Sequence, residues 1–221
     1  MTQPPTRTTP HVYHRTYLMA YDTGTGGLYD RTRTAFLLRA AVLAELAIRG
    51  NLVDSGGDAL VATPGPTGDP VLDLTLDHVA TARRGWHSWI RHDRGETLRT
   101  VEDRLLDQGV LTVDESSSLG RSRRTVRVAD TSAVTALRTT VTGLLHGTRA
   151  AELIAPADAT LVALAAAGGV RPVLSRSDAR AHKDRVAELT GRLTAVAPGL
   201  GKAVGGLGMT LVAAQGGMGG S

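Results

Sequence analysis

The sequence predicts a mainly α-helical fold: a single globular domain of packed helices with two peripheral β-hairpins. Apolar residues recur at spacings of three and four in at least five segments, which is the period of one helix face. The chain has 221 residues, a length that fits one domain or two small ones. Only 3% of the residues are aromatic, and an aliphatic core of Ala, Leu and Val suits packed helices better than a β-sandwich.

The two ends of the chain are expected to lie outside this domain, which we place at residues 16–215. Residues 1–15 contain Thr, Pro and Arg without an apolar period and are predicted to form a disordered arm. Residues 17–21 are predicted as a short strand or an opening turn, followed by a flexible turn at 22–27. The glycine-rich residues 216–221 are predicted as a flexible tail.

The clearest predicted helix covers residues 34–49. Leu38, Val42 and Leu46 lie four residues apart on one face, and Gly50 follows as a stop signal. The same kind of pattern predicts further helices at residues 71–82, 86–90, 97–108, 131–146, 158–167 and 179–197.

The sequence also predicts two helix N-caps and a helix near the C-terminus. Asp130 and Asp158 are expected to act as N-caps, because an aspartate side chain can accept hydrogen bonds from the first free N–H groups of a helix. Residues 203–214 are apolar but much shorter than the roughly 20 residues that span a bilayer. We therefore expect residues 203–214 to form a helix that closes the core.

Two segments predict β-hairpins. Residues 52–62 contain two apolar runs on either side of a Ser-Gly-Gly-Asp turn, and residues 110–128 contain two such runs around a tip rich in Ser and Arg. Both hairpins are expected at the edge of the helical domain.

Several classes of chemistry are excluded or disfavoured. The chain has no Cys, which excludes disulfides, thiolate zinc sites, iron–sulfur clusters and cysteine nucleophiles. No P-loop, HExxH or GxSxG motif is present, and the histidines are scattered. We expect a non-enzymatic protein without catalytic residues, cofactor or metal site. Since neither a signal peptide nor an apolar span is visible, we expect it to be cytoplasmic.

Arginine clusters are the most informative polar feature. Of the 25 basic residues only Lys183 and Lys202 are lysines, and the net charge is +4. Arginine binds phosphate in a bidentate manner, so its clusters suit a membrane headgroup surface or nucleic acid. A helix at 97–108 followed by an Arg-rich hairpin is the order found in winged-helix DNA-binding proteins. Nucleic acid is nevertheless the less favoured partner, because the helix carries Glu102 and Asp103.

Two long strings resemble the Golgi phosphoprotein 3 family. Residues 38–50 are similar to the family's Leu-Arg-Gly…Glu-Leu-Ala-Leu-Arg-Gly run, and residues 66–79 to its Pro-Thr-Gly-Asp…Leu-Lys-His segment. Trp89-Ile90 and residues 105–112 follow in the family's order. The resemblance implies a mostly helical, non-catalytic domain that binds phosphatidylinositol 4-phosphate headgroups on the cytosolic face of a membrane and can tether membrane-protein clients.

The resemblance also implies a headgroup pocket. Arg39 matches the family's Arg directly, and Tyr29 is the aromatic residue nearest to the position of the family's Trp. In one alignment Arg99 falls on the first of two later basic positions and Glu102 on the second. In a gapless alignment backwards from Gly109, the two positions are instead Gly95 and Leu98. In either register Arg94 would have to compensate. Because the pocket is incomplete, a cytosolic interaction adaptor without lipid binding remains an alternative, as does the winged-helix nucleic-acid binder.

The second hairpin is the family's element for membrane contact or self-association. With little apolar surface at its tip, it is expected to lie on lipid headgroups or to dock on a second copy of the chain. Anionic phospholipid headgroups, a homo-oligomer and membrane-protein clients are thus the candidate partners of a peripherally membrane-associated protein. The hairpin residues assigned to this role are Leu119, Arg121, Arg123 and Arg124.

Overall fold

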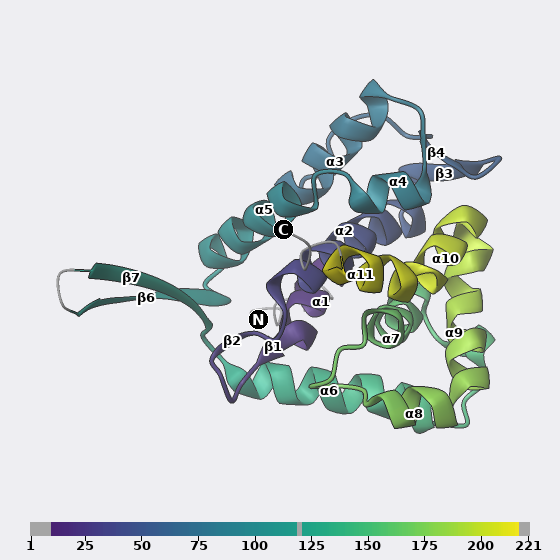
Figure 1. The fold of residues 1–221 in the computed structure, drawn as a ribbon. Helices are drawn as coiled ribbons and strands as arrows, with labels where there is room; N and C mark the ends of the chain where they lie inside the picture. The colour runs from purple at the N-terminus through teal and green to yellow at the C-terminus, as the bar shows by residue number, and fades with distance from the viewer. Residues whose placement is uncertain (1–9, 119–120, 217–221) are drawn as a thin grey trace, which may run out of the picture.

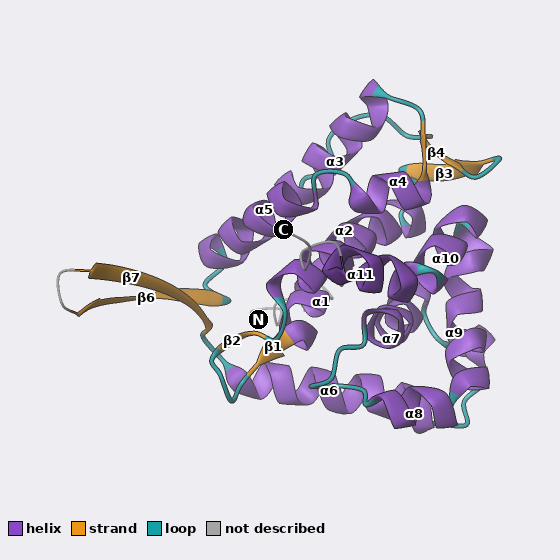
Figure 2. Cartoon of the chain, viewed as in Figure 1, coloured by secondary structure: helices purple, strands orange, loops and turns teal. Residues whose placement is uncertain are grey.

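The computed structural model describes residues 10–118 and 121–216, and it confirms a mainly α-helical fold (Figure 1). Helices surround the central helix α2, and the strands form small antiparallel pairs at the edge (Figure 2). The helices of the described residues are α1 (Val12–Ala20), α2 (Arg31–Ile48), α3 (Pro70–Thr81), α4 (Trp86–Arg91), α5 (Arg94–Asp107), α6 (Thr131–His146), the 3-10 turn η1 (Ala151–Leu153), α7 (Pro156–Gly168), α8 (Arg176–Ala181), α9 (Lys183–Val196), α10 (Pro198–Gly205) and α11 (Leu207–Gly216).

The strands form three separate antiparallel groups. The first group pairs β1 with β2, the second has the order β3-β4-β5, and the third pairs β6 with β7. The strands are β1 (Tyr21–Asp22), β2 (Gly27–Leu28), β3 (Leu52–Ser55), β4 (Asp58–Val61), β5 (Arg84–Gly85), β6 (Leu111–Ser118) and β7 (Arg121–Val128).

Helix α2 is the core of the molecule. Its residues from Thr34 to Ala47 are all buried, because Ala, Leu and Val occupy every side of the helix and not one stripe. Asp30 caps its start by accepting a hydrogen bond of 2.8 Å from the Arg33 N–H. Helices α1, α5 and α7 pack along α2, so α2 sets the position of the surrounding elements.

The N-terminal prediction was wrong where the structure can test it. Val12–Ala20 is a helix, so residues 12–15 are not part of a disordered arm and residues 17–21 do not open with a strand. Val12 and Tyr13 are buried, and the Val12 N–H donates to Glu45 of α2 over 2.6 Å. Tyr13 and Tyr17 lie four residues apart on one buried side of this helix. The prediction missed this spacing because residues 1–15 were treated together as a segment of Pro and polar residues. Residues 1–9 lie outside the described part.

Both predicted hairpins are confirmed. Leu52 pairs with Val61 in the first, which gains the short strand β5 as a third member, and Leu111 pairs with Val128 in the second. The β6–β7 hairpin extends away from the helical body (Figure 1). In its register Ser118 is opposite Arg121, Ser116 opposite Arg123 and Glu115 opposite Arg124; the predicted tip residue Leu119 lies outside the described residues.

The C-terminal half contains more helix breaks than predicted. The expected helix at 179–197 is divided at His182 into α8 and α9, and the expected helix at 203–214 comprises the end of α10 and most of α11. Asp130 does cap α6, but Ala155 holds the N-cap position of α7. Asp158 lies in the first turn of α7 and pairs with Arg15 over 2.5 Å.

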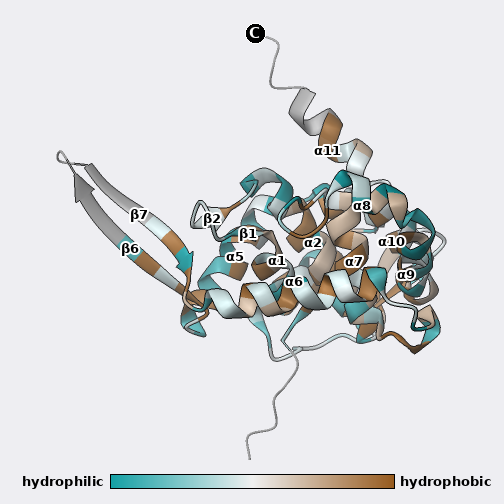
Figure 3. Cartoon of the chain, turned by 90° about the horizontal axis from the view of Figure 1, so that it is seen from below, coloured by the Kyte–Doolittle hydropathy of each residue, from teal (hydrophilic) through white to brown (hydrophobic). Residues whose placement is uncertain are grey.

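Helix α11 projects from one side of the body (Figure 3). Leu207 and Leu211 are buried against the core, while Met209 is 79% exposed and Val212 is 67% exposed. Among the residues that the structure describes, no helix combines the length and apolar character needed to cross a membrane.

Candidate functional site

Three pockets surround the first turn of α2. We name them by their position: the α2–α5 pocket (about 480 Å³), which includes Arg31 and Arg94; the hairpin-base pocket (about 510 Å³), which includes Arg31 and Arg99; and the arginine pocket (about 860 Å³), which includes Arg33. Since consecutive residues of one helical turn point in different directions, this turn contributes to all three pockets.

Arg31 is held in place by a bidentate ion pair. Its two terminal nitrogens donate to the carboxylate oxygens of Glu102 over 2.6 and 2.5 Å, and this hydrogen bonding raises the pKa of the Arg31 guanidinium. Glu102 is buried and also accepts a 3.2 Å hydrogen bond from Tyr17. Arg31 thereby links α2 to α5 at the wall shared by two pockets, while 59% of its own side chain remains exposed.

Arg94 stands at the start of α5 with its guanidinium 4.4 Å from the centre of the Phe36 ring. It donates one hydrogen bond of 2.9 Å to the backbone oxygen of Arg91. The preceding residue, Asp93, has a left-handed backbone with φ of 50° and makes no side-chain cap hydrogen bond. The first N–H groups of α5 are therefore left for a ligand or solvent, next to a fixed guanidinium.

Arg39 lies in the core, where it is only 1% exposed. Its guanidinium donates to the backbone oxygen of Trp89 over 3.1 Å and to the Thr75 hydroxyl over 2.8 Å. Desolvation lowers its pKa to about 10, although the charges of Asp93 and Glu96 oppose this shift. The family resemblance placed Arg39 in the headgroup pocket, and this expectation needs correction. The Arg39 side chain is in the core and not at the surface, and its positive charge lies behind the start of α5.

The other predicted residues do not gather in one pocket. Tyr29 lines the arginine pocket and donates a 3.1 Å hydrogen bond to the Gly168 carbonyl; burial raises its pKa. Arg99 is exposed in the hairpin-base pocket. Of the four residues predicted to bind the headgroup, only Arg94 lines the α2–α5 pocket.

Arg31 was missing from the sequence-based set of site residues. Its partner Glu102 is 71 residues away, so no local spacing could show that these two side chains form one wall. The available signal was the Arg31-Thr-Arg33 cluster at the start of the clearest helix.

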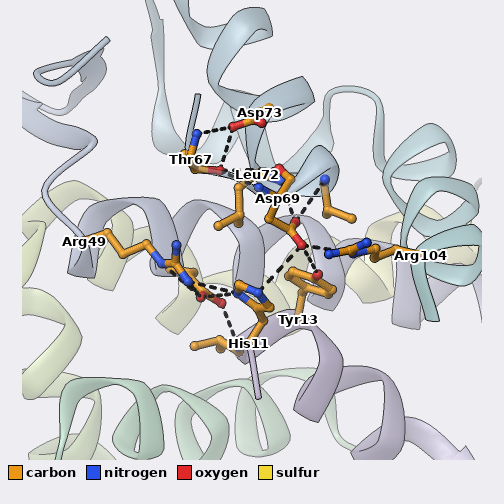
Figure 4. A network of polar contacts seen from close by, with 11 residues as sticks. His11, Tyr13, Arg49, Thr67, Asp69, Leu72, Asp73 and Arg104 are labelled. Carbon is orange, nitrogen blue, oxygen red and sulfur yellow. Dashed lines mark hydrogen bonds and ion pairs between the residues drawn. The ribbon is translucent and has the colours of Figure 1, made fainter. Parts of the chain in front are cut away.

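A polar network holds the framework of the site (Figure 4). The Asp69 carboxylate caps α3 through the Val71 and Leu72 N–H groups, at 3.1 and 3.2 Å. It also accepts hydrogen bonds from Tyr13 over 2.9 Å and from Arg104 over 3.3 Å. One carboxylate thus joins α1, α3 and α5, which accounts structurally for the Pro-Thr-Gly-Asp string.

Asp93 lines the α2–α5 pocket and belongs to a cluster of acidic and histidine side chains beside it. Asp93 lies 2.8 Å from His92 and 3.4 Å from His78. Ligand atoms of His78, Asp93 and Glu96 lie within 4.8 Å of one another. The charge of the buried Arg39 partly offsets the negative charge of Asp93 and Glu96. The expectation that the chain has no metal site stays a prediction.

Comparison with known proteins identifies the family. The family model for Golgi phosphoprotein 3 (GPP34) matches residues 12–206, from the first residue of α1 to the residue after α10. No curated protein gave a significant match. The matched range contains every residue that lines the α2–α5 pocket. Because the match covers most of the sequence, the chain belongs to the Golgi phosphoprotein 3 family.

Proposed function

We propose that this protein is a non-enzymatic, peripheral membrane protein that binds phosphoinositide headgroups in the α2–α5 pocket. One observation carries the proposal: Arg94, Arg31 and the uncapped start of α5 line a single pocket. Family membership supports a phosphatidylinositol 4-phosphate-like ligand on the cytoplasmic side of a membrane.

The chemistry of the pocket suits a phosphate monoester. A guanidinium stacked on an aromatic ring keeps its outer N–H groups in a fixed plane, which favours a charge-assisted fork with two phosphate oxygens. The N–H groups of the first turn of α5 add hydrogen bonds, and the positive end of the helix dipole adds attraction. The buried charge of Arg39 increases the positive potential behind them.

Vesicle flotation tests this function. We expect binding to vesicles that contain phosphatidylinositol 4-phosphate and much weaker binding to phosphatidylcholine vesicles. Arg94→Gln should weaken phosphoinositide binding about fivefold, since one basic residue at an anionic surface contributes about 1 kcal/mol. Arg149→Gln is the control, because Arg149 is exposed and lies in the loop after α6. Equal binding to neutral vesicles would contradict the proposal, and no binding to either kind of vesicle would support the interaction adaptor.

In the winged-helix hypothesis, α5 would insert into the major groove of DNA, and the surface charges of α5 disfavour this. Its buried side packs on the core, and its exposed side carries Arg99, Asp103 and Asp107. Two carboxylates and one guanidinium on this side would be repelled by DNA phosphates. We expect no gel shift of mixed-sequence duplex DNA at physiological salt.

A further inference from the structure

The arginine pocket is distinct from the proposed headgroup site. It lies on the other side of the first turn of α2, at the end of α7, beside α8 and α11. Its volume of about 860 Å³ exceeds that of the α2–α5 pocket, at about 480 Å³. Four arginines from separate segments converge on it: Arg33, Arg138, Arg171 and Arg176.

The positive charge of this pocket is only partly neutralised. Asp22 and Asp30 are its acidic lining residues, and Arg33 is engaged by Asp30 over 3.3 Å. Arg171 and Arg176 are exposed, and neither forms an ion pair with another residue that the structure describes.

The hydrogen bonding of Arg138 is also incomplete at this pocket. One terminal nitrogen donates to the backbone oxygen of Tyr21, but its Nε is buried without a hydrogen-bond partner among the described residues. A guanidinium that is partly desolvated and not fully hydrogen-bonded is stabilised by a negative charge placed in the pocket beside it.

An exposed apolar surface borders the same pocket. Helix α11 contributes Gly208 and Val212 to the lining, and Met209 extends this apolar surface. Helix α11 projects outward from the body, whereas Leu207 and Leu211 anchor its inner side (Figure 3). Arginines beside outward-facing apolar side chains match a membrane interface, where phosphates lie above the acyl chains.

From these observations we propose that the arginine pocket is a second lipid site, which binds the phosphate of an anionic phospholipid while Met209 and Val212 enter the bilayer interface. This site does not depend on the proposed function of the α2–α5 pocket. Binding at each pocket would add to the attachment of the protein to an anionic membrane.

The test uses the full chain and vesicles of phosphatidylcholine with or without phosphatidylserine. Arg171→Glu/Arg176→Glu should weaken binding to the anionic vesicles at least about tenfold, since each arginine contributes about a fivefold factor and the substitution adds repulsion. The charge-matched control is Arg149→Glu/Lys183→Glu, at two exposed positions outside the pocket. Equal binding by the two double variants would overturn the proposal.

A further double variant distinguishes a lipid ligand from a free phosphate compound. Met209→Ser/Val212→Ser should weaken vesicle binding without changing any charge. If this variant binds vesicles normally, and soluble inositol phosphate binds in a manner sensitive to Arg171→Glu/Arg176→Glu, the ligand is a free phosphate compound and the lipid proposal is wrong. If light scattering shows that Arg171→Glu/Arg176→Glu breaks oligomers while vesicle binding is unchanged, the pocket contacts a second copy and the proposal is likewise wrong.

Parallel measurement of Arg94→Gln distinguishes the two sites. Weaker phosphoinositide binding by Arg94→Gln, with Arg171→Glu/Arg176→Glu unaffected on phosphatidylserine vesicles, would support the proposed function and reject the second site. Weaker binding of Arg171→Glu/Arg176→Glu to phosphatidylserine vesicles would support the second site. If Arg94→Gln then binds phosphoinositide and phosphatidylserine vesicles as the wild type does, the α2–α5 pocket is rejected as the headgroup site.

Discussion

Asp69 joins three helices through one carboxylate that is only 2% exposed. Asp69→Ala should lower the free energy of unfolding by about 2–4 kcal/mol, because it removes a helix cap and leaves Tyr13 and Arg104 without their partner. Urea denaturation measures the change. Asp107→Ala, at an exposed position, should change stability by less than about 0.5 kcal/mol. Similar midpoints for the two variants would contradict the anchoring role of Asp69.

His14 should make the docking of α1 sensitive to pH. Burial, followed by the charges of His11 and Arg15, lowers its pKa below the ordinary value of 6.5. The unfolded chain then binds more protons between that lowered value and 6.5, so stability is complete above 6.5 and falls as the pH decreases. We expect the wild type to lose stability as the pH decreases through 6.5, and His14→Gln to lose less.

Urea midpoints measured above and below pH 6.5 test this prediction. Glu45 does not confuse the result: although burial acts to raise its pKa, hydrogen bonding and the charge of His11 outweigh burial and lower it below 4.5. Its contribution is therefore lost only at more acidic pH. An identical pH dependence in His14→Gln and wild type would show that His14 plays no part.

At the scale of elements, α9 and α10 approach closely at a glycine. A Cβ on Gly201 would lie 2.8 Å from the Thr194 Cα, a backbone atom that cannot rotate away. Gly201→Ala should therefore destabilise the protein by about 1–3 kcal/mol. Gly191 of α9 is a matched control with open space at its Cβ, and Gly191→Ala should be stabilising by up to about 1 kcal/mol. Thermal melts that move in the same direction for both variants would refute this packing argument.

The helices also differ in how visible their boundaries are in the sequence. The start of α6 was predicted correctly, because Asp130 accepts a hydrogen bond from the Ser132 N–H two residues later. The start of α7 was predicted at Asp158 but lies at Pro156, whose fixed φ suits a first helical position. Asp158 instead pairs with Arg15, 143 residues away, a contact that no local pattern could reveal.

At the scale of the whole molecule, the C-terminal helices close the core. Deletion of residues 203–221 removes Leu207 and Leu211, which are 0% and 2% exposed. Burial of each leucine contributes about 1.5–3 kcal/mol, so the melting temperature should fall by about 10 °C or more. Met209→Ser is the control, since Met209 is 79% exposed and should leave the melt unchanged. An unchanged melt after the deletion would contradict the closing role.

The sequence was sufficient for the fold class, the central helix and both hairpins. These features depend on patterns within one element. Apolar residues at spacings of three and four identify a helix, and a glycine turn between two apolar runs identifies a hairpin, whatever the element packs against. The two family-like strings also identified the family, because they retain the residues that form α2 and the cap of α3.

The candidate site depended on contacts between distant residues. The sequence around Arg39 matches a family string and suggested a pocket residue. In the structure, hydrogen bonds to the Thr75 hydroxyl, 36 residues away, and to the Trp89 backbone, 50 residues away, hold Arg39 in the core. Arg31 forms a pocket wall only because α5 brings Glu102 beside it. The same residue type is buried in one case and exposed in the other, because the surrounding helices cover α2 on every side from Thr34 to Ala47 but leave its first turn at the surface.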